Sequence, residues 1–130
     1  MGRNVLAVIT GIVTWFAIVF LAGFAFRLWP AYQAAAPTMS FDFSMKIARL
    51  AVSSVALIAA ALALWRVRAS RAVELAFSAV MLLLFIPEHY LLWSKFPIWY
   101  HLTFLTSLVL LPLFVALAAL QVGAKPALPS

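Results

Sequence analysis

The chain has 130 residues, of which 68% are hydrophobic and 9% charged, and its mean hydropathy is +1.15. This composition is typical of an integral membrane protein and excludes an ordinary soluble domain. The length and the scarcity of polar residues indicate a single transmembrane domain over residues 1–130. Nine Lys and Arg against three Asp and Glu give a formal charge of +6. These basic residues stand beside apolar segments, so they predict contacts with membrane lipid and not with nucleic acid.

Four apolar segments follow one another along the chain, at residues 5–28, 47–65, 72–92 and 98–122. Each is close to the ~20 residues that cross ~30 Å of hydrocarbon as a helix. The first is longer than the apolar core of a signal peptide, so we expect it to be retained. The linkers are short, which favours neighbouring antiparallel helices. The sequence therefore predicts an all-α, integral membrane four-helix bundle of up-down-up-down topology, with a loose tail at residues 123–130.

Two prolines, Pro87 and Pro112, lie inside apolar segments. If the third helix ended before Pro87, it would be only about 22 Å long at ~1.5 Å per residue, which is too short to span a bilayer comfortably. We therefore expect this helix to continue through Pro87, with a kink at each proline.

The linker RVRASR carries three arginines and determines the predicted orientation. By the positive-inside rule this loop lies in the cytoplasm, and both termini lie there with it. The basic residues predicted inside are Arg3, Arg66, Arg68, Arg71 and Lys125, and those predicted outside are Arg27, Lys46, Arg49 and Lys95.

Aromatic residues with a polar edge gather at the predicted outer interface. They are Trp29, Tyr32, Tyr90, Trp93, Trp99 and Tyr100. Such rings favour headgroup depth in a membrane. A lipid belt explains them, but so many on one side of a small bundle also suggest a cavity or a partner surface at the outer face.

Two stripes at helical spacing are predicted to face the interior, because small side chains allow close helix packing and ionisable groups avoid lipid. One stripe is Arg49, Ser53, Ala56, Ala60 and Ala63, and the other is Glu74, Ser78, Met81, Phe85 and Glu88. Arg49 would either pair with Glu88 near the outer end or extend to the headgroups beside Lys46. For Glu74 we expect a local pair with Arg71 at the start of its helix.

The candidate polar cluster consists of Arg49, Glu88, His89 and His101. The two histidines with Glu88 would suit a metal or haem site, but their spacing matches no known ligand motif, and we expect neither group. Glu88 beside a histidine would also suit proton transfer. No activated nucleophile and no phosphate-binding glycine loop accompanies it, so we expect no catalytic residue and no cofactor.

The run FPIWYHLTFLTSLVLLPL, with IPEHYLLW before it and FRLWPAY after the first segment, resembles small bacterial inner-membrane proteins with four predicted transmembrane helices. That resemblance implies a bacterial inner membrane and this architecture, and no activity. Small multidrug-resistance transporters are similar in size, but they use a glutamate in the first helix, where this chain has no acidic residue.

The sequence favours a non-enzymatic inner-membrane accessory or interaction component. Its aromatic, polar outer face would meet lipid, an amphipathic small molecule, a membrane protein partner or a second copy of the chain. The first alternative is a small oligomeric transporter or channel that uses Glu88 and Arg49. A metal or haem carrier or a membrane enzyme at Glu88, His89 and His101 is the second alternative.

Overall fold

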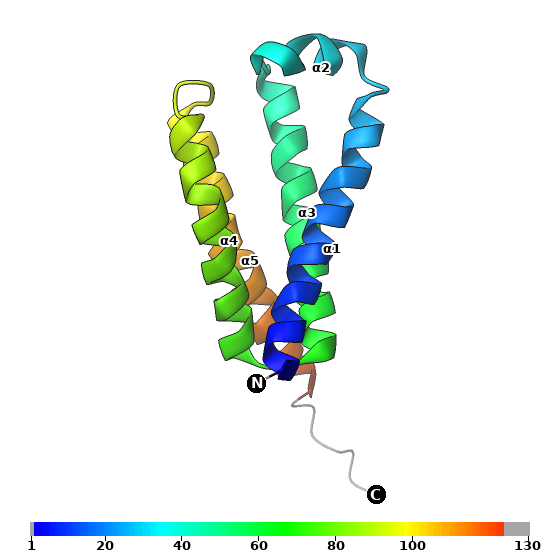
Figure 1. Ribbon diagram of the computed structural model, residues 1–130, viewed down its shortest axis with the longest axis vertical. Coiled ribbons are helices and arrows are strands. Elements are labelled where there is room, and N and C mark those ends of the chain that lie inside the picture. Colours follow the sequence, from blue (N-terminus) through cyan, green and yellow to red (C-terminus); the bar gives the residue numbers. More distant parts are fainter. Residues whose placement is uncertain (1, 124–130) are drawn as a thin grey trace, which may run out of the picture.

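A computed structural model describes residues 2–123, which form four long helices and a short helical connection (Figure 1). The long helices are α1 (Gly2–Phe26), α3 (Phe43–Val67), α4 (Arg71–Leu91) and α5 (Ile98–Gly123). All four are long and apolar enough to cross a membrane. The predicted all-α four-helix bundle is confirmed, and the composition makes the chain a multi-pass membrane protein. The predicted tail beyond Gly123 lies outside the described residues.

Helix α3 begins at Phe43, earlier than predicted, because Asp42 caps it. The Asp42 carboxylate accepts a hydrogen bond from the backbone N–H of Met45 at 2.9 Å and another from the Ser44 hydroxyl at 2.7 Å. These two hydrogen bonds hold the pKa of Asp42 below its usual range. An aspartate at the N-cap satisfies one of the free N–H groups of the first turn. The four residues before Ile47 therefore belong to the helix and not to the linker.

The connection between α1 and α3 contains α2 (Pro30–Ala35) and the 3₁₀ turn η1 (Ala36–Thr38), which were not predicted. Pro30 stands at the first position of α2, where its missing N–H costs nothing. Met39 then adopts a left-handed conformation with φ of 54° and ends the turn. In Figure 1 this segment crosses one end of the bundle above α1 and α3. We call this end, which also holds the α4–α5 loop, the distal end, and the opposite one the proximal end.

The four long helices form two antiparallel pairs, α1 with α3 and α4 with α5, and α3 also packs against α5. Consecutive helices α3 and α4 were predicted to be neighbours because their linker is short, but they touch little. They meet at the linker and then diverge, so that α4 separates from α1 and α3 toward the distal end (Figure 1), while α3 and α5 remain in side-chain contact there. The short linker fixes only the proximal ends of these two helices.

At the proximal end the bundle is closed by tight packing around Gly11. A Cβ atom at Gly11 would lie 3.1 Å from the Phe77 ring and 3.3 Å from Leu64, so only glycine lets α1 approach α4 and α3 this closely. Arg3 strengthens this end because its Nε donates to the carbonyl of Val67 at 2.9 Å, at the C-terminus of α3. Close contacts therefore hold α1 against α3 and α4 in the proximal half of the bundle.

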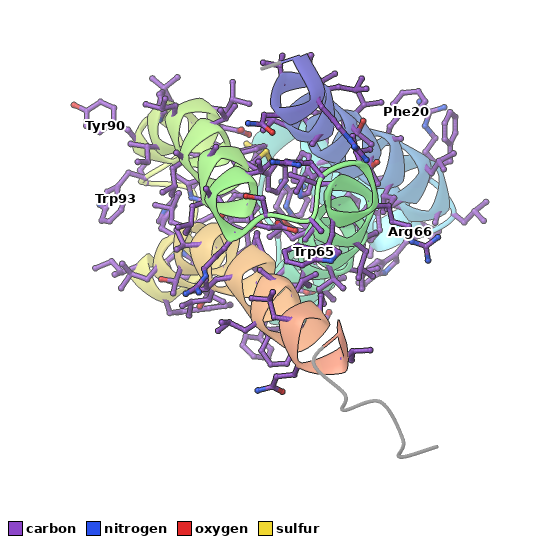
Figure 2. The ribbon with its side chains drawn as sticks, turned by 90° about the horizontal axis from the view of Figure 1, so that it is seen from below. Phe20, Trp65, Arg66, Tyr90 and Trp93 are labelled. Atoms are coloured by element: carbon purple, nitrogen blue, oxygen red, sulfur yellow. The ribbon has the colours of Figure 1, made fainter. Side chains whose placement is uncertain are left out.

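The predicted inward stripes are largely confirmed. On α3, Ser53, Ala56 and Ala60 are buried, with Arg49 and Ala63 half-buried. On α4, buried Glu74, Ser78, Met81 and Phe85 follow the prediction, whereas Glu88 is exposed and the next residue, His89, is buried. Helix α4 continues through Pro87 to Leu91, as predicted. Large apolar side chains such as Phe20 project outward from the bundle (Figure 2), as lipid-facing residues do.

Candidate functional site

A cavity of about 420 Å³ occupies the distal half of the bundle, where α4 diverges from α1 and α3. Its volume lies in the ~300–1,000 Å³ range of small-molecule sites. Its lining residues come from every described helix except the short turn η1. They are Trp15, Phe16, Val19, Gly23, Phe26, Arg27, Tyr32, Gln33, Arg49, Val52, Ser53, Phe85, Glu88, His89, Leu92, Phe96, Tyr100 and Phe104.

The cavity reaches the surface of the bundle between α1 and α4. Phe16 of α1, Arg27 just after the end of α1, and Glu88 of α4 belong to its lining, and all three are exposed. Phe16 is 48% exposed at a depth where the surrounding helix surface is apolar. The opening therefore lies on the side of the bundle and is bordered by both apolar and charged side chains.

Contacts among aromatic rings form the floor of the cavity. Trp15 packs edge-on against Phe85, with ring centroids 4.9 Å apart, and Phe85 packs against Phe104 at 5.2 Å. These rings come from α1, α4 and α5. Below them, Phe77 and Met81 are fully buried, so no described cavity continues from this floor toward the proximal end.

Arg49 lies in the wall of the cavity, inside a cage of aromatic residues. Its Nη1 donates to the Tyr32 hydroxyl at 2.7 Å, and its Nε donates to the Tyr100 hydroxyl at 3.2 Å. The guanidinium carbon lies 4.9 Å from the centroid of the Phe41 ring and 5.7 Å from that of Phe96. Two phenol oxygens and two ring faces therefore surround the positive charge.

The predicted Arg49–Glu88 ion pair is absent within residues 2–123. Both side chains line the same cavity, but the Arg49 hydrogen bonds go to the two tyrosines, and Glu88 is exposed. The alternative, in which Arg49 extends to the headgroups, does not describe the structure either, because Tyr32 and Tyr100 hold the guanidinium in the interior. The cation is thus fixed in place without a carboxylate partner in the described part of the chain.

His89 and His101, predicted to lie near each other, form a direct hydrogen bond. Their Nδ1 atoms are 2.7 Å apart, and both side chains are buried. Trp93 stacks on the His101 ring with centroids 4.6 Å apart. His89 packs against Phe104 at 4.6 Å and lines the cavity, so the pair connects the cavity wall with the α4–α5 loop.

The contacts of this pair assign its neutral tautomers. His101 Nε2 lies 3.3 Å from the Trp93 carbonyl, which can only accept, so His101 carries its proton on Nε2. Its Nδ1 is then the acceptor, and His89 Nδ1–H is the donor. In neutral His89 the remaining nitrogen, Nε2, carries a lone pair and has no hydrogen-bond partner among the described residues. His89 therefore offers the cavity a hydrogen-bond acceptor.

The same geometry argues against a bis-histidine haem site. Axial ligands on opposite faces of a haem need room for the macrocycle and its iron between them, whereas these two Nδ1 atoms are at hydrogen-bond distance. Within residues 2–123, no group of three or more His, Cys, Asp or Glu side chains is placed to hold a metal ion. The pair is best described as a buried hydrogen-bonded unit in the cavity wall.

We expect replacement of His101 by leucine to destabilise the protein by about 1–3 kcal/mol, because the buried N–H of His89 loses its acceptor. His89→Leu removes the donor and leaves the His101 acceptor unpaired. The double variant leaves neither Nδ1 group unpaired, so its cost should be smaller than the sum of the single costs by about 1 kcal/mol or more. Thermal unfolding in detergent micelles measures all three variants. Additive costs would contradict the assigned bond.

The six aromatic residues predicted at the outer interface take two kinds of position. Tyr90 projects away from the bundle (Figure 2), Trp93 and Trp99 are exposed, and Trp29 is half-buried. Tyr32 and Tyr100 instead are buried and directed at Arg49. The first group suits a membrane interface, while the second belongs to the cavity.

Glu74 differs from its prediction as well. It is fully buried, and neither carboxyl oxygen has a hydrogen-bond or ion-pair partner among residues 2–123. The expected pair with Arg71 is therefore not formed, and Arg71 is exposed. Ser78, one turn further along α4, is also buried with an unpartnered hydroxyl. Both residues lie in the packed proximal half and are not part of the cavity lining.

Two other buried polar atoms without partners belong to residues of the cavity lining, namely Trp15 Nε1 and Ser53 Oγ. Ser53 was predicted to face the interior, but nothing in the sequence marked Trp15 as more than an apolar core residue. A tryptophan near the middle of a predicted span is the one signal that would have identified it, since its N–H needs a partner when buried.

No family model, curated protein or solved structure matches the chain.

Proposed function

We propose that this protein is a non-enzymatic accessory component of the bacterial inner membrane that binds an amphipathic small molecule in the distal cavity. The observation that carries the proposal is the cavity itself, which is open between α1 and α4 and has an aromatic floor and polar upper walls. An amphiphile with one hydrocarbon chain would place that chain against Phe16 and Val19 and its polar head near Arg49. Such a molecule enters from the surrounding leaflet without crossing water.

The arginine distribution supports an orientation with the distal end outside. The proximal end holds Arg3, Arg66, Arg68 and Arg71, three of them in the short α3–α4 connection and its flanks. By the positive-inside rule this end faces the cytoplasm, which places the cavity in the outer half of the bilayer. The bound amphiphile would then come from the outer leaflet of the inner membrane.

The transporter alternative requires a polar path through the bundle. Below the cavity floor stand Phe77, Met81 and Leu57, all fully buried and apolar. A binding role needs no such path, and this ranks binding above transport. A membrane protein partner or a second copy of the chain remains compatible with the exposed aromatic residues of the α4–α5 end.

The experiment that tests this proposal is native mass spectrometry of protein extracted from its membrane in mild detergent. We expect wild-type protein to retain a bound amphiphile and Gly23→Phe to lose it, because Gly23 lines the cavity and open space surrounds the position of its Cβ. Leu21→Phe is the matched control, since Leu21 is on the same helix, is 64% exposed and does not line the cavity. Equal retention by both variants, or no bound amphiphile in wild type, would refute the proposal.

A further inference from the structure

We infer that the ligand of the distal cavity carries an oxyanion head, a carboxylate or a phosphate monoester, and that Arg49 binds it. This inference rests on the proposed function and names the chemistry of its ligand. It follows from the charge of the cavity wall, from the hydrogen-bonding groups that the wall leaves free, and from the depth at which these groups lie.

The first argument is that Arg49 keeps free donors. A guanidinium has five N–H groups, of which one Nε and one Nη1 donor are engaged by Tyr100 and Tyr32. The remaining Nη donors make no hydrogen bond to the described residues, and no carboxylate pairs with Arg49 within them. Because the aromatic cage fixes the guanidinium plane, the free edge is already oriented when a ligand arrives. A planar, fixed guanidinium suits carboxylate and phosphate oxygens, which it binds in a bidentate manner.

The second argument comes from the two unpartnered donors. Trp15 Nε1–H can only donate, and the Ser53 hydroxyl is free to donate because it makes no bond to the preceding turn of α3. Each residue is only 4% exposed. A buried polar group without a partner costs about 1–3 kcal/mol, and an acceptor-rich head or its bound water would remove this cost. Both residues belong to the cavity lining, so these unpaired donors lie directly behind its inner surface.

Ser53 and Trp15 lie at a similar depth in the bundle, below Arg49. Ser53 is one turn below Arg49 on the same face of α3, and at ~1.5 Å per residue it lies about 15 Å from the start of that helix. Trp15 lies about 16 Å from the distal end of the antiparallel α1, by the same measure. Donors therefore line the cavity from its upper wall to its floor. His89 Nε2 is the acceptor among them, and it suits a protonated oxygen of the head.

The net charge of the cavity lining favours a ligand with an anionic head. The charged lining residues are Arg27, Arg49 and Glu88, with a net charge of +1. Glu88 and Arg27 are exposed, so solvent screens their effect, whereas Arg49 is held inside the cage. A cationic head would meet Arg49 at close range and gain only the exposed Glu88. A zwitterionic head would contact both Arg49 and Glu88, so the experiment includes a zwitterionic probe.

The test uses photoactivatable probes with one identical hydrocarbon tail and five heads: carboxylate, phosphate monoester, primary alcohol, phosphocholine and trimethylammonium. The probes are added to the full-length protein in nanodiscs, and the labelled residues are mapped by mass spectrometry. We expect the carboxylate or the phosphate to label the cavity at Phe16, Val19 and Gly23 about tenfold more than the alcohol, a factor that corresponds to ~1.4 kcal/mol. Comparison of the two oxyanion arms identifies which of them the site prefers.

Arg49→Gln should reduce oxyanion labelling to the level of the alcohol, while Arg27→Gln, which removes the exposed cation of the same cavity, should retain most of it. If Arg49→Gln does not fold, Ser53→Ala serves in its place and should reduce oxyanion labelling with no change in alcohol labelling. Equal labelling by all heads, or preferred labelling by the zwitterion or the cation, overturns the oxyanion inference and leaves the proposed function intact. Cavity labelling by none of the five probes overturns the proposed function itself.

Discussion

Replacement of Arg49 by methionine is expected to lower the free energy of unfolding by about 2–4 kcal/mol. The variant loses two hydrogen bonds from a charged donor, each worth about 1.5–3 kcal/mol, and the contacts of the guanidinium with Phe41 and Phe96. Removing a half-buried charge from the interior returns part of this loss. Thermal unfolding of wild type and variant in the same micelle measures the difference. Lysine at this position should recover only part of the lost free energy of unfolding, because its ammonium group cannot bind both hydroxyls and stack between the rings at the same time.

The control for this prediction is a double-mutant cycle with the tyrosines. Tyr32→Phe and Tyr100→Phe should each destabilise wild type, since each removes one acceptor of the guanidinium. In the Arg49→Met background the same changes should cost little, because the hydroxyls have already lost their partner. If the costs of the arginine and tyrosine substitutions simply add, the cage does not contribute as described.

The fold could be predicted because hydrophobicity alone determines it. Four apolar segments of membrane-spanning length leave few other architectures, and Pro87 was correctly placed inside a helix by the length argument. The helix starts were less accurate. Asp42 is a strong N-cap residue, and its position directly before Phe43 marks the start of α3. A prediction based on hydropathy alone does not use this signal.

The neighbour relations of the helices could not be derived from linker length. A short α3–α4 linker brings the ends of these helices together but leaves their axes free to diverge. The two helices diverge because each packs against different partners. Helix α3 buries Ala56 and Ala60 against other helices, while α4 buries Phe85 against Trp15 and Phe104. The divergence creates the cavity, so the cavity could not be predicted from the sequence.

Of the candidate cluster, only the contact between the two histidines could be derived from the sequence. His89 and His101 stand at facing ends of helices joined by a short loop, and proximity in sequence made their contact predictable. For Arg49 the sequence left pairing with Glu88 and extension to the headgroups open, because its partners Tyr32 and Tyr100 come from the unpredicted helix α2 and from α5, far apart in the chain. Charge complementarity favoured Glu88 in the prediction. In the structure two neutral hydroxyls and aromatic faces take that place, which leaves both charges available to a ligand.

The second large effect is expected at Glu74, where leucine should raise the free energy of unfolding by about 1–3 kcal/mol. Glu74 is fully buried, and neither carboxyl oxygen has a partner within residues 2–123. Burial of an unpaired polar group costs free energy that an apolar side chain of similar size does not incur. Thermal unfolding in micelles, with Glu74→Gln as the matched control, measures the effect. Glutamine remains polar and unpaired, so it should leave stability nearly unchanged.

The sign of the Glu74→Leu result also decides how the proximal half should be understood. An increase in stability would mean that the chain retains a destabilising carboxyl group at this position, and ionisable groups inside membrane helices are retained at such a cost mainly where they have a role. The distal cavity does not supply that role, because Glu74 lies outside its lining. A decrease would contradict the prediction and would show that the carboxyl group has a stabilising partner in the membrane. Stability measured with Ser78→Ala in both backgrounds then tests whether the neighbouring hydroxyl is that partner.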